Sequence, residues 1–138
     1  MRRTICIIIT MVLCLCMTAC GNNAHKGDLW ENALYVQDTE LGNGEKMLSV
    51  KVEAEDKTVT FTIHTDADTV GEALSEHELI SGEKGPYGIY VKNVNGITAD
   101  YDIDQSYWSF NKDGEYMQTG VDSTSFEDGD SYELVYTK

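Results

Sequence analysis

The chain has 138 residues, of which 24 are acidic and 10 are basic, so its formal net charge at pH 7 is −14. An acidic surface repels phosphate backbones, and nucleic acid is therefore excluded as an expected partner. One proline and 12 glycines favour a single ordered domain over a disordered stalk, and no internal repeat suggests an array.

The first 20 residues have the organisation of an export signal. Arg2 and Arg3 supply a positive start, residues 5–17 are almost entirely apolar, and small residues precede Cys20. An ordinary cleaved signal or an uncleaved membrane helix are the alternatives, although a spanning helix needs about 20 apolar residues. Cleavage before Cys20 would leave it as the sole cysteine, because Cys6, Cys14 and Cys16 lie inside the apolar stretch.

Residues 17–20, Met-Thr-Ala-Cys, resemble the lipobox of bacterial lipoproteins, with Met17 in place of the commoner leucine. The resemblance implies a lipoprotein signal peptide over residues 1–19 and a diacylglyceryl group on Cys20. Two acyl chains give stable attachment, which implies a location on the outer face of the bacterial cytoplasmic membrane. Residues 20–28 are interpreted as a lipid-anchored tether. Its last eight residues reach about 25–29 Å at most, so the folded part is expected close to the membrane.

Residues 29–138 are expected to form one domain with its core within residues 46–137. Residues 33–36 are a candidate edge strand, and residues 41–44 predict a turn. Two segments with alternating apolar residues, 47–54 and 58–64, predict a hairpin with one buried face. The residues expected in the core from this hairpin and the following helix are Leu48, Val50, Val52, Val59, Phe61, Ile63, Val70 and Leu74.

A helix is predicted to begin after Thr69, which forms a capping box with Glu72. Apolar residues then recur with helical spacing on one stripe that ends at His77. The helix is expected to be over by Gly82. His77 is interpreted as a packed, hydrogen-bonded histidine rather than a ligand.

The second half of the chain predicts further strands separated by turns. Residues 81–86 are interpreted as a loop, and Asn95-Gly96 is a strong hairpin signal. The segments expected to be extended are residues 88–94, 107–110, 115–118 and 132–137. Two strands, one helix and then more strands predict an α+β fold, with one helix packed on a β-grasp-like mixed sheet.

Metal-binding and catalytic patterns are weak. Asp100, Asp102 and Asp104 alternate, and an extended chain would place three carboxylates on one face, as calcium prefers. The run lacks the other features of a calcium loop, so a solvated loop and no metal site are expected. The three histidines fit no Ser-His-Asp or HExxH pattern, so no catalytic residue is predicted and the chain is not expected to be an enzyme.

Several segments are together similar in order and spacing to the DUF4430 family, the transcobalamin-like C-terminal domain. They are TVGEAL at 69–74, YGIYV at 87–91, VNGI at 94–97, YWSF at 107–110, EDGD at 127–130 and YELVY at 132–136. The resemblance covers roughly Lys46 to Thr137 and implies a β-grasp-like domain that binds soluble ligands. In animal cobalamin carriers this module closes over one face of the corrinoid, so the resemblance implies a corrinoid as a possible ligand. No cofactor is expected.

Aromatic residues are the candidate ligand contacts, because they offer large, rigid contact areas to ring-shaped molecules. The candidates are Tyr107, Trp108, Phe110 and Tyr116, with Tyr87 and Tyr90 in addition. For each of them the alternative is a place in the core. Adjacent strand residues point to opposite faces, so only one of Tyr107 and Trp108 is expected to face a ligand.

The expected function is a lipid-anchored surface protein that captures a small molecule for a membrane transporter. Its expected partners are the membrane, the small molecule and a transporter subunit. The alternative is an interaction or adhesion module that binds another protein or a glycan, because fold analogy alone does not choose between these roles.

Overall fold

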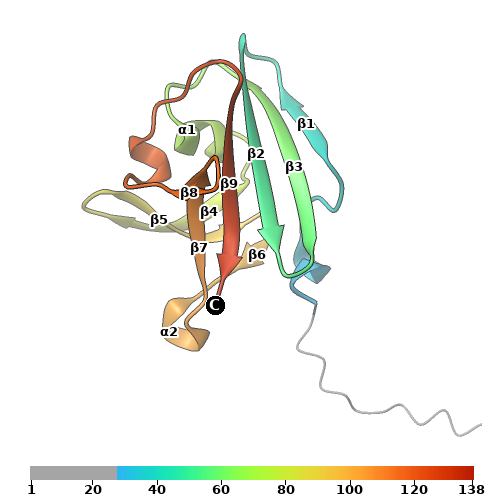
Figure 1. The fold of residues 1–138 in the computed structure, drawn as a ribbon, viewed down its shortest axis with the longest axis vertical. Helices are drawn as coiled ribbons and strands as arrows, with labels where there is room; N and C mark the ends of the chain where they lie inside the picture. The colour runs from blue at the N-terminus through green and yellow to red at the C-terminus, as the bar shows by residue number, and fades with distance from the viewer. Residues whose placement is uncertain (1–27) are drawn as a thin grey trace, which may run out of the picture.

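The computed structural model describes residues 28–138, which form an α+β domain (Figure 1). The predicted fold class is confirmed. Two 3-10 helices, η1 and η2, accompany two short α-helices and nine strands. In chain order the elements are η1 (Leu29–Asn32), β1 (Thr39–Gly42), β2 (Lys46–Ala54), β3 (Lys57–Thr65), α1 (Val70–Ser75), β4 (Ile80–Gly85), β5 (Gly88–Val94), β6 (Ile97–Thr98), α2 (Tyr101–Asp104), β7 (Tyr107–Lys112), β8 (Glu115–Tyr116), η2 (Val121–Ser123) and β9 (Asp130–Thr137).

The strands form two sheets, where the sequence suggested one. The larger sheet is mixed and has the order β1-β3-β2-β9-β7-β8. β2 and β3 pair antiparallel with Val50 opposite Phe61, and β9 joins the other edge of β2 in parallel, with Tyr132 opposite Val50. The smaller sheet has the order β4-β5-β6, and its β4–β5 hairpin runs across the strands of the larger sheet in Figure 1.

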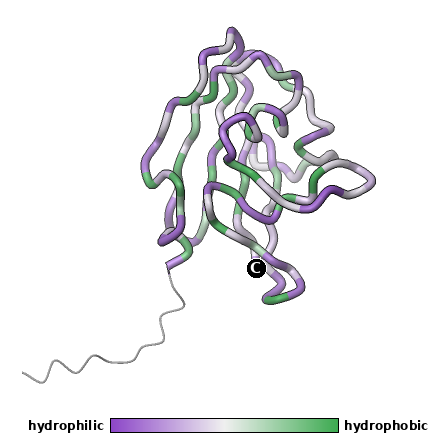
Figure 2. Tube along the Cα trace, turned by 180° about the vertical axis from the view of Figure 1, so that it is seen from behind, coloured by the Kyte–Doolittle hydropathy of each residue, from purple (hydrophilic) through white to green (hydrophobic). Residues whose placement is uncertain are grey.

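The core lies on the inner face of the larger sheet, under α1 and the smaller sheet. Figure 2 shows the apolar residues alternating with polar ones along the long strands. All eight residues predicted for the core are buried, none with more than 2% of its surface exposed. The strand parity predicted for β2 and β3 is therefore confirmed.

The predicted N-terminus of the helix is also confirmed. The Thr69 hydroxyl accepts a hydrogen bond from the Glu72 N–H at 3.2 Å, as an N-cap residue does. The Glu72 carboxylate reaches back to the N–H of Asp68 at 3.0 Å. The helix ends at Ser75, two residues before His77.

The predicted edge strand at residues 33–36 is wrong, because the side chain of Asn95 occupies the place of a partner strand. Its amide accepts a hydrogen bond from the Tyr35 N–H at 2.9 Å and donates one to the Tyr35 carbonyl at 2.8 Å. Asn95 and Gly96 have φ of 52° and 81°, which matches the hairpin turn that their sequence predicted. The edge strand is instead β1, which pairs with β3 in parallel.

The loop predicted at residues 81–86 is also wrong, since β4 pairs antiparallel with β5 over most of this segment. Its residues after Ile80 are exposed, and a bulge lies between Ser81 and Gly82. An edge strand of this kind needs no alternation of apolar and polar residues. The strand predicted over residues 115–118 is shorter than expected, because β8 ends at Tyr116.

The predicted signal peptide and Cys20 lie outside the described residues. Asp28, the last residue of the predicted tether, is the N-cap of η1 and forms an ion pair of 2.9 Å with Lys57. Over residues 28–138, no helix is both long and apolar enough to cross a membrane.

Candidate functional site

A pocket of about 260 Å³ lies where the smaller sheet meets the edge of the larger one. Residues 89–91 of β5 form one wall, and Trp108 and Phe110 of β7 form another. Tyr116 and residues 117–121 lie along a third side. We call residues 117–121 the strap, since this segment connects β8 to η2 across the pocket.

The β7 wall is built from two aromatic residues on one face of the strand. Trp108 and Phe110 are each only 8% exposed, and the Trp108 indole donates a hydrogen bond to the Ile97 carbonyl at 3.2 Å. The Trp108 ring packs edge-on against Tyr136, and the Phe110 ring stacks on Tyr132 at 5.4 Å between centroids. These contacts hold both rings in place before any ligand arrives.

Tyr90 and Tyr116 form the exposed rim of the pocket, with 49% and 68% of their surfaces exposed. The strap adds the amide of Gln118 beside them. Among the described residues, neither the two tyrosine hydroxyls nor the Gln118 side chain takes part in a hydrogen bond with another protein group. The rim therefore offers donors and acceptors to a bound molecule.

The structure brings four of the six aromatic candidates to this pocket: Tyr90, Trp108, Phe110 and Tyr116. It does not bring the other two there. Tyr87 lies in the β4–β5 turn and is 89% exposed, and Tyr107 lies on the opposite face of β7 from Trp108. Only one of Tyr107 and Trp108 was expected to face a ligand, and Trp108 is the one that lines the pocket.

Sequence reasoning did not identify the strap as part of a site. Its residues carry no periodic pattern, and their position depends on hydrogen bonds to nearby Thr124 and on a long-range contact just beyond the strap. The Thr124 hydroxyl donates to the Gly120 carbonyl at 2.8 Å and lies 2.7 Å from the Thr119 hydroxyl. Just beyond the strap, the Asp122 carboxylate accepts a hydrogen bond from the Ile89 N–H at 2.9 Å.

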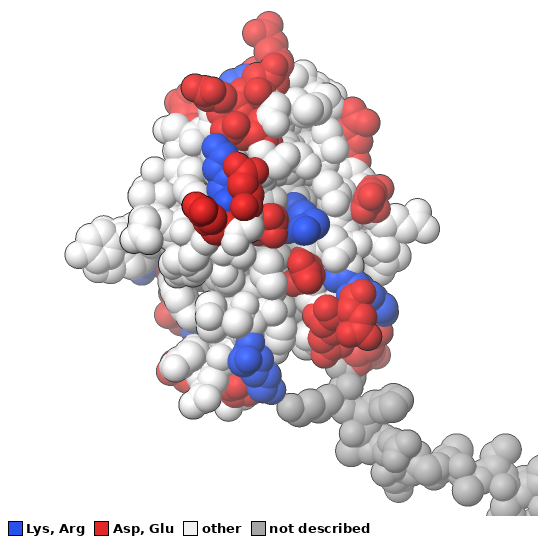
Figure 3. Space-filling model, viewed as in Figure 1, with Lys and Arg blue, Asp and Glu red and all other residues white. Residues whose placement is uncertain are grey.

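The pocket lining contains no Asp, Glu, Lys, Arg or His. The sequence as a whole has 24 acidic and 10 basic side chains, so the pocket differs in charge from the rest of the protein. Figure 3 shows charged groups over the strands of the larger sheet as well as its turns, whereas the left of the view, where the β4–β5 hairpin projects, is mostly uncharged. The pocket is therefore a neutral, partly aromatic site on an acidic protein.

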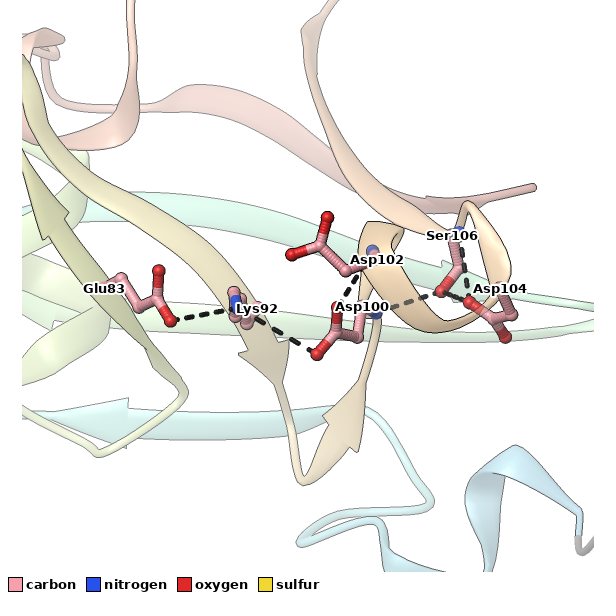
Figure 4. A network of polar contacts seen from close by, with 6 residues as sticks. All are labelled: Glu83, Lys92, Asp100, Asp102, Asp104 and Ser106. Carbon is pink, nitrogen blue, oxygen red and sulfur yellow. Dashed lines mark hydrogen bonds and ion pairs between the residues drawn. The ribbon is translucent and has the colours of Figure 1, made fainter.

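The aspartate run at 100–104 was expected to be a solvated loop, but it forms the short helix α2 and its N-cap (Figure 4). Asp100 caps α2 by accepting a hydrogen bond from the Asp102 N–H at 3.0 Å. Asp104 accepts bonds from the N–H and the hydroxyl of Ser106, which lower the pKa of its carboxyl. The carboxylates of Asp100 and Asp104 are thus used to shape the chain.

Lys92 links this run to the smaller sheet (Figure 4). Its ammonium donates a hydrogen bond to Glu83 at 3.1 Å, which raises the pKa of Lys92, and lies 3.9 Å from Asp100. Within residues 28–138, no group of three or more His, Cys, Asp or Glu residues is placed to hold a metal ion.

His77 does not form the hydrogen bond that was expected at its ring. Its Nε2 atom is buried and has no hydrogen-bond partner among the described residues. A Cβ atom at Gly42 would lie 3.2 Å from this nitrogen, so the backbone of β1 approaches the ring closely.

Comparisons with known proteins agree with this architecture. The chain is similar to the crystal structure of a Ruminococcus gnavus protein that has been proposed to bind metal, with 38% identity and a TM-score of 0.64 over 68% of this chain and 98% of that one. It is also similar to haptocorrin solved in complex with Cbi, with 19% identity and a TM-score of 0.54. This likeness covers 71% of the chain but 27% of haptocorrin, and it concerns the fold alone.

The sequence profile of the DUF4430 family, described as a domain of unknown function, matches residues 67–138. Those residues include the β4–β5 hairpin, β7, the strap and β9, and so every wall of the pocket. The curated proteins contain no match to this chain. By the profile match and the 38% identity to the Ruminococcus gnavus protein, the chain belongs to the DUF4430 family.

Proposed function

We propose that this chain is a lipid-anchored surface protein that captures a small molecule in the pocket between β5 and β7. The observation that carries the proposal is the pocket itself, with two rigid aromatic rings inside and unengaged polar groups at its rim. Ligand sites in proteins commonly combine an apolar lining with a few polar groups in this way.

The comparisons support a ligand-binding role in general terms. One similar protein has been proposed to bind metal, and haptocorrin was solved with Cbi bound. A corrinoid is the first ligand to test. At about 260 Å³ the pocket is smaller than the roughly 300–1,000 Å³ of sites that enclose drug-sized ligands. A corrinoid would therefore rest on the mouth of the pocket, with only a peripheral group inside.

The anchor and the transporter belong to the same proposal. A diacylglyceryl group on Cys20 and a short tether would keep the pocket near the outer face of the cytoplasmic membrane. A bound molecule would then be released beside membrane proteins, where a transporter subunit could accept it.

Two measurements test the proposal. Native mass spectrometry of protein purified from its own host should show an adduct of defined mass. In a Trp30→Phe variant Trp108 is the sole tryptophan, and titration with cobalamin or cobinamide should quench its fluorescence saturably. Calorimetry on the same samples separates binding from light absorption by the coloured ligand. Protein without an adduct and without saturable quenching would contradict the proposal.

An interaction module is the second candidate, and the surface of α2 favours it. Ile103 is 82% exposed and Tyr101 is 55% exposed, which is unusual for large apolar side chains on a small acidic domain. A photoreactive residue placed at position 103 should form a discrete protein adduct on host cells under this reading. The same photoreactive residue placed at position 90, in the pocket, should then form no protein adduct.

A further inference from the structure

We infer that the pocket between β5 and β7 admits an uncharged, single-ring-sized group that carries a hydrogen-bonding substituent. This inference rests on the proposed function, and it names the chemical class of the group that enters the site. It follows from three properties of the pocket: the charge of its lining, its volume and the position of its polar groups.

The charge of the lining selects against ions. A charged group that enters the pocket loses water, and no Asp, Glu, Lys, Arg or His lines the pocket to pair with it. The carboxylate of Asp122, next to the lining residue Val121, is outside the lining and accepts a hydrogen bond from the Ile89 N–H at 2.9 Å. Anions are disfavoured further, because the chain carries a net charge of −14 that repels them at long range.

The volume limits the size of the group. An apolar cavity of about 150 Å³ is enough to hold benzene. The pocket has about 260 Å³, which leaves room for one ring with a substituent. A larger ring system would have to remain outside the mouth.

The polar groups fix how the ring would lie. Trp108 and Phe110 are nearly buried and present apolar surface at the inner wall. The Gln118 amide lies on the strap, and the exposed tyrosines 90 and 116 carry their hydroxyls at the rim. The apolar edge of a ring would enter first, and a neutral amide or hydroxyl substituent would remain at the rim, within reach of these donors and acceptors.

Benzamide, benzamidine and benzoate test the inference, because they share one ring and nearly one shape but are neutral, cationic and anionic. The full chain would be held in micelles of a nonionic polyoxyethylene detergent, and each dissociation constant would be measured by ligand-observed NMR. Protein-free micelles correct for partitioning. We expect benzamide to bind at least about tenfold more tightly than benzoate, with benzamidine between them.

Two pairs of tyrosine variants locate the binding. Tyr90→Ala and Tyr116→Ala remove exposed rim residues and should each weaken benzamide binding several-fold. Tyr87→Ala and Tyr107→Ala are the matched controls, since these tyrosines do not line the pocket and should leave binding unchanged. Because all four side chains are exposed, none of these changes should unfold the protein.

The outcomes separate this inference from the proposed function. If benzoate or benzamidine binds as tightly as benzamide, or if none of the three binds, the assignment of an uncharged ring is wrong. It is also wrong if the control variants weaken binding as much as the rim variants. The proposed function is judged separately by the adduct from the host and by corrinoid titration, so it survives any of these results if an adduct is found.

Discussion

The carboxylate of Asp122 accepts a hydrogen bond from the backbone N–H of Ile89 at 2.9 Å. These two residues are 33 positions apart, and their contact joins the beginning of β5 to the residue that directly follows the strap. Both β5 and the strap line the pocket. One side chain that does not itself line the pocket therefore links two of its walls.

Replacing Asp122 with Ala should loosen these walls. We expect a loss of about 1 kcal/mol in the free energy of unfolding, the usual net contribution of a hydrogen bond, since the side chain is exposed. Asp122→Asn keeps an acceptor and should lose less. Urea unfolding measures the effect, and Asp56→Ala, which removes an exposed carboxylate from the β2–β3 turn, is the control. Equal losses in the Asp122→Ala and control variants would show that the contact contributes nothing.

Gly71 should be sensitive to the same side chain. A Cβ atom at this position would lie 2.1 Å from Oδ1 of Asp122. Gly71→Ala should therefore push α1, which contains residue 71, away from η2, which contains Asp122. Ala is the better helix former, so a loss in the free energy of unfolding from Gly71→Ala would come from this clash. Adding Asp122→Ala removes the clashing carboxylate and should recover part of that loss. A double-mutant cycle measures the coupling. Simple additivity of the two single changes would show that the clash is relieved in another way.

Phe61→Ala tests the core. Phe61 has no exposed surface, and its ring packs edge-on against Tyr35 with centroids 5.5 Å apart. We expect a loss of about 3–5 kcal/mol in the free energy of unfolding, as for other buried aromatic residues. Val36→Ala, at a side chain that is 67% exposed, should cost far less. A loss below about 1 kcal/mol for Phe61→Ala would contradict the packing described here.

Asp130 should make the fold sensitive to acid. The Glu127 N–H donates a hydrogen bond to its carboxylate at 3.0 Å, and Lys112 lies 3.3 Å away; both lower its pKa from the ordinary 3.8. A lowered pKa in the folded state stabilises the protein above the ordinary value, and this contribution is lost as the pH falls through the folded pKa. The stability difference between the natural chain and Asp130→Asn should be constant near neutral pH and shrink below about pH 4. Urea unfolding at a series of pH values measures it, and a difference that does not change with pH would rule out this role.

The lipid anchor has a direct test at Cys20, which lies outside the described residues. Cys20→Ala should release the protein from the membrane fraction or leave its signal uncut. Mass spectrometry of the natural chain should find Cys20 as the first residue with acyl mass attached. A mature chain that still contains Met17, or that lacks the acyl mass, would contradict the assignment.

The elements that the sequence predicts well are those whose periodicity comes from burying one face. β2, β3 and the start of α1 belong to this group, since their apolar residues meet the core at regular intervals. β4 does not, because after Ile80 it exposes all of its residues and is held by backbone pairing with β5. The run at 100–104 has an alternating pattern that suits an extended chain, yet local capping by Asp100 makes it helical.

The pocket was predictable only in part, for a related reason. Aromatic residues close together in the sequence indicate one wall, and alternation along β7 separates Trp108 from Tyr107. The strap owes its place to long-range contacts such as that of Asp122 with Ile89. No local pattern encodes such a contact, so the opposite wall could not be assigned before the structure was known.

The position of β9 has a consequence for how the chain acquires its structure. β9 lies between β2 and β7 and pairs with both, although it is separated from β2 by more than 70 residues. Until residues 130–137 have been synthesised, β2 and β7 have no partner between them and the larger sheet stays divided. Pairings between such distant segments form slowly, because the loop between them must close first. An export apparatus that engaged the chain during synthesis would therefore meet it before the larger sheet is complete.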